Sequence, residues 1–409
     1  MTAHLFRAGR LVDGTGSRPV LDAAVLVESG RVVAAGRASE VSVLPGARDA
    51  QQWDCRGQTL IPGLIDGHVH VTQTRAGDPG WDVASQVPSQ HAALGLASVQ
   101  VALAAGVTTL RDAGAAGGVT LELRRLLDTG LVAGARLLAC GPLLTTTGGH
   151  ADYLGVTADT AHELRLAIRR LAHRRPDAVK IVATGGSSDP HSNRHRAQYT
   201  VDELAAAVAE AERFGLHVVA HCNATEGIRN AVAAGVRIIA HANFLAAESG
   251  HIDADPDVAA DLVARGAYVD LNLPAAMVPL ADYDGDLDDR PDLPVDRWEL
   301  LTRLGLARRA FFTSDEHGPR VREFPGLLAA AAKLWSLPAE DVVWRAGGLA
   351  ASALELGPDY GTLTPGSVAD LVVLDGDLVT DLSSLERPHL VFQGGRLAAD
   401  RGRLVLPAP

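Results

Sequence analysis

The stretch Gly63-Leu-Ile-Asp-Gly-His-Val-His70 has the form of a short apolar strand that ends in two histidines. Seven more segments have this form, each an apolar run with a polar residue or a glycine at its end: 106–112, 135–141, 178–184, 216–221, 236–241, 267–272 and 310–315. Helical stretches separate them, and one of these, 200–214, opens with the helix-capping sequence Thr200-Val-Asp-Glu203. Eight strand–helix units over roughly 290 residues predict an α/β fold, a (β/α)8 barrel of the TIM type. An open doubly wound sheet is the alternative, but no Gly-x-Gly-x-x-Gly motif follows a strand to support it.

The two ends of the chain resemble each other and differ from the middle. Residues 1–58 and 357–409 contain short alternating strands with glycine turns, a pattern typical of antiparallel sheets. We therefore expect one small β-sandwich domain formed by both termini, and a barrel over residues 59–356. The acidic, proline-containing stretch 282–296 follows the seventh strand, where barrel enzymes place substrate-facing loops.

Composition excludes several classes of protein. The 409 residues are 47% hydrophobic and carry a formal net charge of −12, which argues against a nucleic-acid binder or an anionic-membrane binder. The three cysteines, Cys55, Cys140 and Cys222, form no Cys-x-x-Cys pair, so a disulfide scaffold and a zinc ribbon are excluded. Residues 85–110 indicate a buried helix and a strand rather than a membrane span, and no signal peptide is visible. We expect a cytoplasmic globular protein with a small-molecule substrate.

The strand ends carry the residues that predict chemistry: His68, His70, Lys180, His221, His241 and Asp315. Singly, a strand histidine is usually a hydrogen-bonded core residue and a strand-end aspartate is often a helix cap. In a barrel, however, the carboxyl ends of all strands meet at one mouth, and the His-x-His spacing turns both imidazoles the same way. Imidazole and carboxylate groups hold Zn²⁺ and related divalent ions. Together these residues predict a metal site.

Lys180 lies inside the apolar strand Ala-Val-Lys-Ile-Val-Ala-Thr, where a buried ammonium is costly. Lysine occurs only at Lys180 and Lys333, because arginine supplies every other basic residue. A buried lysine can become neutral and react with carbon dioxide to give a carbamate, whose two oxygens can bridge two metal ions. The alternative is a lysine whose amine reaches solvent at the barrel rim. Lys333 lies on a helical stretch, where a solvent-exposed role is expected.

The chain resembles the metal-dependent amidohydrolase superfamily, in the branch with prolidase-like dipeptidases and imidazolonepropionase-related enzymes. The segments that carry this resemblance are IPGLIDGHVH, VKIVATGG, the strand ends VVAH and IIAH, TSD, and LTPGSVADLVVLDGD near the C-terminus. The resemblance covers essentially the whole chain. His-x-His alone is a weak signal, but the ordered set of six strand-end residues is highly specific.

The resemblance implies two divalent metal ions, with zinc ahead of manganese, iron and cobalt. His68, His70 and Asp315 match the ligands of the more buried metal, His221 and His241 match those of the second, and Lys180 matches the carboxylated bridging lysine. A hydroxide between the metals is then the nucleophile, and Asp315 moves its proton to the leaving group. His150 matches a histidine that contacts the scissile carbonyl in related enzymes; its alternative is a solvent-exposed loop histidine.

The departures from the family pattern lie at the barrel mouth. Ala240-His241-Ala242-Asn243 replaces Glu-His-Gly, and Asn223 replaces an aromatic residue or a histidine of peptidase-like relatives. His317 and Arg320 follow the eighth strand in an unusual segment. We interpret His150, Asn223, Asn243, His317 and Arg320 as candidate substrate-binding residues, and the departures place peptidase activity in doubt.

The sequence therefore predicts a binuclear hydrolase that cleaves a carbon–nitrogen amide bond in a peptide-like substrate, an N-acyl amino acid or a cyclic amide. A lactonase or phosphotriesterase would use the same metals, and a non-catalytic binding relative would lack ligands. A mononuclear deaminase is disfavoured because Ala224 stands where such enzymes have glutamate. The sequence gives neither the substrate nor the oligomeric state, although an apolar barrel face would suit a homodimer.

Overall fold

A computed structural model of the chain describes residues 3–74, 87–186, 192–247, 251–281 and 295–405. The predicted substrate-facing segment 282–296 lies outside these residues, apart from its last two positions, where a helix begins. Among the helices of the described part, none is long and apolar enough to cross a membrane.

The eight predicted strands are all present. They are β5 (Leu64–His70), β6 (Val107–Asp112), β7 (Arg136–Ala139), β10 (Val179–Val182), β11 (Val218–Ala224), β12 (Ile238–Leu245), β13 (Tyr268–Asn272) and β14 (Ala310–Thr313). Three short strands join them: β8 (Leu143–Thr145), β9 (Gly155–Thr157) and β15 (Glu316–His317). They pair in parallel in two sheets, β15-β5-β6-β7 and β14-β13-β12-β11-β10-β8-β9. The result is an α/β fold built on parallel sheets, consistent with the predicted TIM-type barrel.

Hydrogen bonds join the edges of the two parallel sheets. At one junction the Asp315 amide, just after β14, donates to the His68 carbonyl on β5 over 2.8 Å. Beside it, the Ser314 hydroxyl donates to the Asp66 carboxylate over 2.5 Å. At the other junction the Asp177 amide, ahead of β10, donates to the Ala139 carbonyl at the end of β7 over 3.0 Å.

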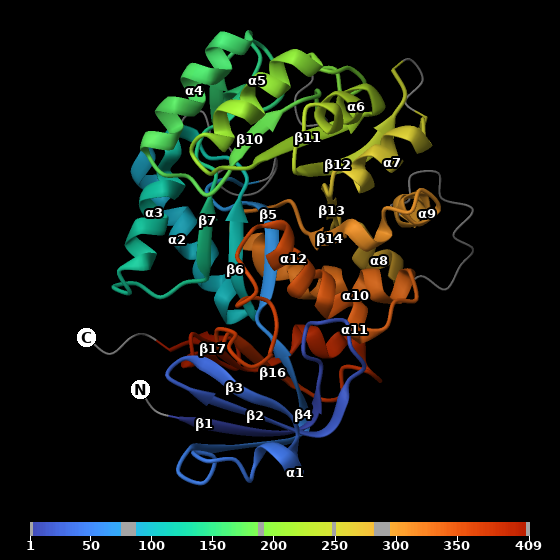
Figure 1. Cartoon of the computed structure of the whole chain (residues 1–409). Coiled ribbons are helices and arrows are strands. Elements are labelled where there is room, and N and C mark those ends of the chain that lie inside the picture. The colour runs from blue at the N-terminus through green and yellow to red at the C-terminus, as the bar shows by residue number, and fades with distance from the viewer. Residues whose placement is uncertain (1–2, 75–86, 187–191, 248–250, 282–294, 406–409) are drawn as a thin grey trace.

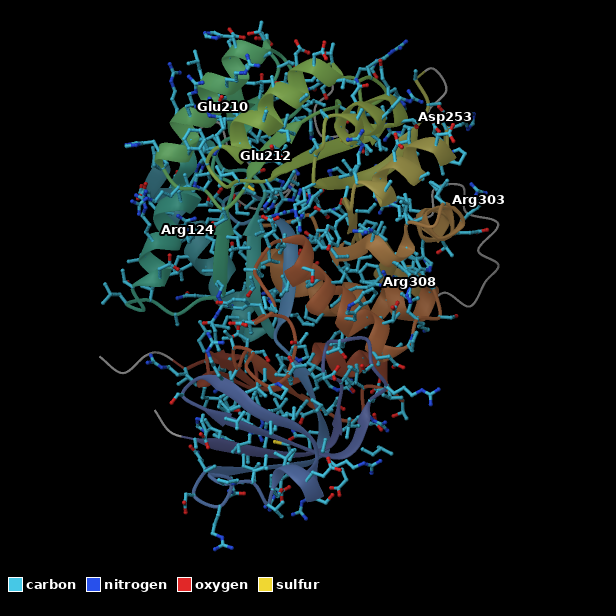
Figure 2. All side chains as sticks on the ribbon, viewed as in Figure 1. Arg124, Glu210, Glu212, Asp253, Arg303 and Arg308 are labelled. Carbon is cyan, nitrogen blue, oxygen red and sulfur yellow. The ribbon has the colours of Figure 1, made fainter. Side chains whose placement is uncertain are left out.

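Helices pack around the parallel strands, as Figure 1 shows. They are α2 (Pro88–Ala104), α3 (Val119–Asp128), α4 (Ala161–His173), α5 (Val201–Glu212), α6 (Thr225–Ala233), α7 (Pro256–Ala264), α8 (Met277–Ala281), α9 (Val295–Arg303), α10 (Phe324–Leu334), α11 (Ala339–Arg345) and α12 (Gly348–Ala353). The predicted capping box is confirmed, because the Glu203 amide donates to the Thr200 hydroxyl and the Glu203 carboxylate accepts from the Thr200 amide. Glu210 on α5, labelled in Figure 2, pairs with Arg169 of α4 at 2.7 Å, which links the two neighbouring helices.

Strands from both ends of the chain form one further sheet. They are β1 (His4–Leu11), β2 (Val20–Glu28), β3 (Arg31–Arg37) and β4 (Gln51–Pro62) from the N-terminal part, and β16 (Leu371–Asp375), β17 (Pro388–Gln393), β18 (Arg396–Asp400) and β19 (Arg403–Leu404) from the C-terminal part. Their order is β19-β18-β17-β16-β4-β1-β2-β3, so β4 and β16 join the two halves, which are blue and red in Figure 1. The short helix α1 (Ala38–Val41) covers β2 and β3.

The terminal sheet contacts the amino ends of the parallel strands. Arg136, the first residue of β7, pairs with Asp370 at 2.6 Å, and the Gln393 amide donates to the Thr108 carbonyl on β6 over 3.0 Å. The carboxyl ends of the parallel strands point away from this contact and remain available for a site. The three cysteines are free and buried.

Candidate metal centre

The six predicted metal-ligating residues line one cavity of about 510 Å³ at the carboxyl ends of the parallel strands. Its lining residues are His68, His70, Gln73, Leu143, His150, Ala151, Tyr153, Leu154, Lys180, Val182, His221, Asn223, His241, Asn243, Asp315 and His317. The set includes four of the five candidate substrate-binding residues. Histidines from strands far apart in the sequence therefore meet in one place, as convergence of the strand ends requires.

Hydrogen bonds orient the two histidines of β5. His68 Nδ1 lies 2.7 Å from the carboxylate of Asp270, and His70 Nδ1 lies 3.1 Å from the Gly114 carbonyl oxygen. Because both partners only accept hydrogen bonds, each Nδ1 carries the proton and each Nε2 is left with a lone pair. Histidines that ligate metals are held in this way by carboxylates or carbonyls behind them.

The tightest group of ligand atoms comes from three different strands or strand ends. One ligand atom each of His68, His241 and Asp315 lie within 4.8 Å of one another. Asp315 Oδ1 also lies 3.5 Å from His68 Nε2 and 3.6 Å from His70 Nε2. His68 and Asp315 belong to the predicted ligands of the first metal, and His241 belongs to those of the second. The two predicted sets of ligands therefore lie side by side.

Burial favours the neutral form of the four histidines among the predicted ligands. It lowers the pKa of His70 to about 4, and it places the pKa values of His68, His221 and His241 well below the usual value of 6.5. The nearby Lys180 charge acts in the same direction on all four residues. Neutral imidazole is the form that binds a metal, so these groups need lose no proton to do so.

Lys180 is the basic residue at the centre of the cavity. Its side chain is 2% exposed, and its Nζ lies 3.2 Å from His68 Nε2. Burial lowers the pKa of the amine, and among the described residues no carboxylate lies within ion-pair distance. A buried amine with these surroundings has access to its neutral, nucleophilic form.

The backbone is strained at two of the ligand positions. His241 and Ala242 have φ values of 68° and 47°, and Asp315 has a φ of 55°. These values lie in the left-handed region, which residues other than glycine rarely adopt. The pairing of β12 with β11 shifts register at this point. Such strain concentrates at functional sites. Here it turns the end of β12 so that His241 and Asn243 both line the cavity.

Two buried charges behind the site are absent from the sequence-based prediction. Asp270 on β13 accepts from Thr313 with one oxygen over 2.5 Å, and its other oxygen faces both His68 at 2.7 Å and Arg111 of β6 at 3.4 Å. Both charged side chains are buried, and burial raises the pKa of Asp270 while Arg111 opposes that rise. A charged residue inside an apolar strand was the available signal for both, as it was for Lys180.

Arg320 lies apart from the other candidate substrate-binding residues. Its guanidinium pairs with Glu316 at 3.2 Å and with Glu323 at 3.1 Å. It lines a different, larger cavity of about 870 Å³ between the barrel helices and the terminal sheet, and no histidine lines that cavity among the described residues. The structure therefore brings His150, Asn223, Asn243 and His317 to the metal-ligating residues but not Arg320.

The rings around the cavity form a continuous series. His150 lies 4.7 Å from His221 between ring centroids, His221 lies 4.4 Å from His241, and His317 lies 5.2 Å from His70. His150 reaches the cavity from the loop after β8, and His317 from β15. Both are therefore placed where a molecule in the cavity would meet them.

We compared the chain with a family model, with curated relatives and with solved structures. The model of the amidohydrolase family matches residues 59–290. The chain is 24% identical to ochratoxinase from Aspergillus niger, over 95% of this chain and 85% of that protein. It is 29% identical to imidazolonepropionase from Rhizorhabdus wittichii, over 96% of each chain. A crystal structure of a prolidase complexed with N-methylphosphonate-L-proline superposes with a TM-score of 0.82 and 27% identity, over 98% of this chain and 100% of that one.

The family match spans more than half of the chain and includes the four strands that carry five of the six metal-ligating candidates. The chain belongs to the amidohydrolase family. It is an enzyme, a hydrolase that acts on carbon–nitrogen bonds.

Proposed function

We propose that this member of the amidohydrolase family is a binuclear metal-dependent hydrolase that cleaves the amide bond of a small peptide-like, N-acyl amino acid or cyclic amide substrate. The observation that carries the proposal is the convergence of four histidines, one lysine and one aspartate on a single cavity. A cavity of about 510 Å³ is of the size that takes a small molecule.

The proposal includes a fold in two parts. The two parallel sheets are inferred to close into one (β/α)8 barrel over residues 59–356, which the hydrogen bonds across both sheet junctions support. The terminal sheet, over 1–58 and 357–409, is inferred to fold over itself as a β-sandwich. Phe6 on β1 and Phe392 on β17 stand three strands apart in the sheet, yet their rings lie 4.9 Å apart. In a flat sheet that separation would be about 14 Å.

The donor set fits two divalent metal ions. His68, His70 and Asp315 would hold one, and His221 and His241 would hold the other. Nitrogen and carboxylate ligands of this kind favour zinc, and the carboxylate behind His68 is the support that zinc ligands usually have. The ions would supply an activated water at neutral pH and would polarise the scissile carbonyl.

Lys180 is proposed to be carboxylated and to bridge the two ions. Its burial, the lowered pKa of its amine and its position beside His68 Nε2 support this role. Reaction of the neutral amine with carbon dioxide forms an N–C bond and releases one proton, giving a carbamate with one negative charge. Arginine cannot do this, since its guanidinium stays protonated.

Asp315 is proposed to move the proton of the reaction. Its side chain is 32% exposed toward the cavity, and its oxygen lies within 3.6 Å of both β5 histidines. The carboxylate would take a proton from the attacking water and would then deliver it to the amine nitrogen as the carbon–nitrogen bond breaks. His150, Asn223, Asn243 and His317 would hold the acyl group and the rest of the substrate.

A screen of substrates tests the proposed function. Protein loaded with zinc or manganese is assayed for kcat/KM on dipeptides, N-acyl amino acids, cyclic amides, lactones and a phosphotriester. We expect the best amide to exceed every lactone and the phosphotriester. A lactone or phosphotriester that exceeds every amide ten-fold or more would contradict the assignment of the bond, and no turnover of any panel member by fully metallated protein would favour a non-catalytic relative.

A further inference from the structure

A chain of hydrogen bonds runs from helix α9 to the edge of the metal centre. Arg297, in the first turn of α9, donates from Nη1 to Asn243 Oδ1 over 3.0 Å. Asn243 Nδ2 donates to Asn223 Oδ1 over 2.6 Å. Asn223 Nδ2 donates to the Gly185 carbonyl over 3.0 Å and lies 2.9 Å from His221 Nε2. Both asparagines line the cavity, and Arg297 lies behind them.

Arg297 sets the direction of this chain. A guanidinium can only donate hydrogen bonds, so the amide oxygen of Asn243 must face it. The amide nitrogen of Asn243 then faces Asn223, and Asn223 must in turn accept with its oxygen. The NH₂ group of Asn223 is thereby directed to the cavity edge beside His221. A neutral residue in place of Arg297 would leave the Asn243 amide free to rotate by 180°, so that Asn223 would keep its bond to the Gly185 carbonyl but lose the fixed donor to its oxygen.

The guanidinium is held firmly and keeps its charge. Its Nη2 donates to the Asn272 carbonyl on β13 over 2.6 Å, so the side chain connects the two neighbouring parallel strands β12 and β13. Burial lowers the pKa of Arg297 to about 10, which leaves it protonated at neutral pH. Among the described residues no carboxylate pairs with it, so its positive charge polarises the two amides in sequence.

We propose that Arg297 is a positioning residue, which acts through Asn243 to hold the Asn223 amide as a hydrogen-bond donor to the oxygen of the scissile carbonyl. This inference rests on the proposed amide hydrolysis. As the carbonyl carbon becomes tetrahedral, negative charge develops on that oxygen, and a donor oriented in advance stabilises it. One hydrogen of the Asn223 NH₂ group binds the Gly185 carbonyl and the other faces His221 Nε2; if His221 gave that lone pair to a metal, the second hydrogen would be left for the substrate oxygen beside it.

An isosteric change at Asn243 makes the inference specific. Asn243→Asp replaces the amide nitrogen that faces Asn223 with a second oxygen. The Asn223 oxygen then loses its donor and faces a carboxylate oxygen, while rotation of the Asn223 amide would bring that oxygen against the Gly185 carbonyl, so neither orientation holds the NH₂ group as firmly. We expect kcat/KM to fall by ~100-fold or more, as for loss of an oxyanion donor, with the loss mainly in kcat.

A double-mutant cycle between Arg297 and Asn223 tests the coupling. The variants are Arg297→Met, Asn223→Ala and the double variant, with Arg297→Lys as the conservative change. Arg303→Met is the matched control, because Arg303 lies on the same helix, exposed at the periphery of the molecule (Figure 2). For each, kcat and KM on the best amide, metal content, melting temperature and the Kd of methylphosphonate by calorimetry are measured on the zinc-loaded enzyme.

We expect Arg297→Met to lower kcat/KM ten-fold or more in the wild-type background and less than two-fold in the Asn223→Ala background. Methylphosphonate affinity should follow the same pattern, Arg297→Lys should retain part of both, and Arg303→Met should change neither. Additive effects in the cycle, with amide turnover present in the wild type, would overturn the relay alone. A coupled cycle in methylphosphonate binding, without amide turnover by the wild type, would overturn the proposed function and leave the relay standing.

Discussion

At the scale of single residues, burial shifts the central cavity toward neutral groups. It lowers the pKa of Lys180 and of the four histidines proposed as ligands, and Asp270 lies behind His68 as a hydrogen-bond partner. A chain that uses arginine almost everywhere keeps lysine here. The proposed reaction of the amine with carbon dioxide, which arginine cannot undergo, would account for that choice.

Substitution of Lys180 tests its bridging role. Lys180→Ala should lower turnover by roughly 100-fold, because the bridging oxygens are lost and metal binding weakens. Bicarbonate or short-chain carboxylates should partly restore activity in Lys180→Ala but not in Lys180→Arg, since the guanidinium fills the space. Lys333→Ala, at the exposed second lysine, is the control and should behave as the wild type. Normal turnover in Lys180→Arg would rule out the bridge.

Substitution of Asp315 tests the proton transfer. Asp315→Asn keeps the size of the side chain but removes the base, so kcat should fall by ~100-fold or more while substrate still binds. Metal content must be measured beside the rate, since the carboxylate is also a proposed ligand. A fully metallated Asp315→Asn enzyme with near-normal kcat would assign the proton transfer to another group.

At the scale of elements, the loop after β8 and the segment after β10 contact each other beside the cavity. The His150 imidazole, from the loop after β8, packs against the backbone of Gly186 after β10. A methyl group at Gly186 would overlap the ring. A glycine at this position is therefore required for His150 to reach its place beside His221.

Gly186→Ala is expected to displace His150 from the cavity. If His150 contacts the substrate carbonyl, Gly186→Ala should lower kcat/KM as far as His150→Ala does, and the double variant should be no worse than either. Gly148→Ala is a matched control in the same loop as His150, because a methyl group there meets open space, although its φ of 64° is less favourable for alanine. Full activity of Gly186→Ala, with His150→Ala impaired, would show that the ring does not depend on this contact.

The strands and the ligand positions were predictable from the sequence, while the supporting contacts were not. Periodicity and strand-end polarity located β5, β10, β11, β12 and β14 and the residues that meet in the cavity. The partner of His68, Asp270, lies 202 residues away, and the partner of Asn243, Arg297, lies 54 residues away. Arg320 was predicted at the mouth, but Glu316 and Glu323 hold it beside a different cavity. Local pattern contains no information on such pairings.

At the scale of the whole molecule, the terminal sheet and the candidate metal centre lie at opposite ends of the parallel strands. The terminal sheet contacts the amino ends of the parallel strands through Arg136–Asp370 and Gln393–Thr108, and the candidate metal centre lies at the opposite, carboxyl ends. Residues from both termini thus support the fold without reaching the cavity.

The metal content of the active enzyme tests the central claim most directly. Protein saturated with zinc, freed of excess ion by dialysis and analysed for metal and for protein concentration should contain two ions per chain, with turnover of amides rising as the second ion binds. One ion per chain together with full activity would contradict the binuclear site formed by His68, His70, Lys180, His221, His241 and Asp315.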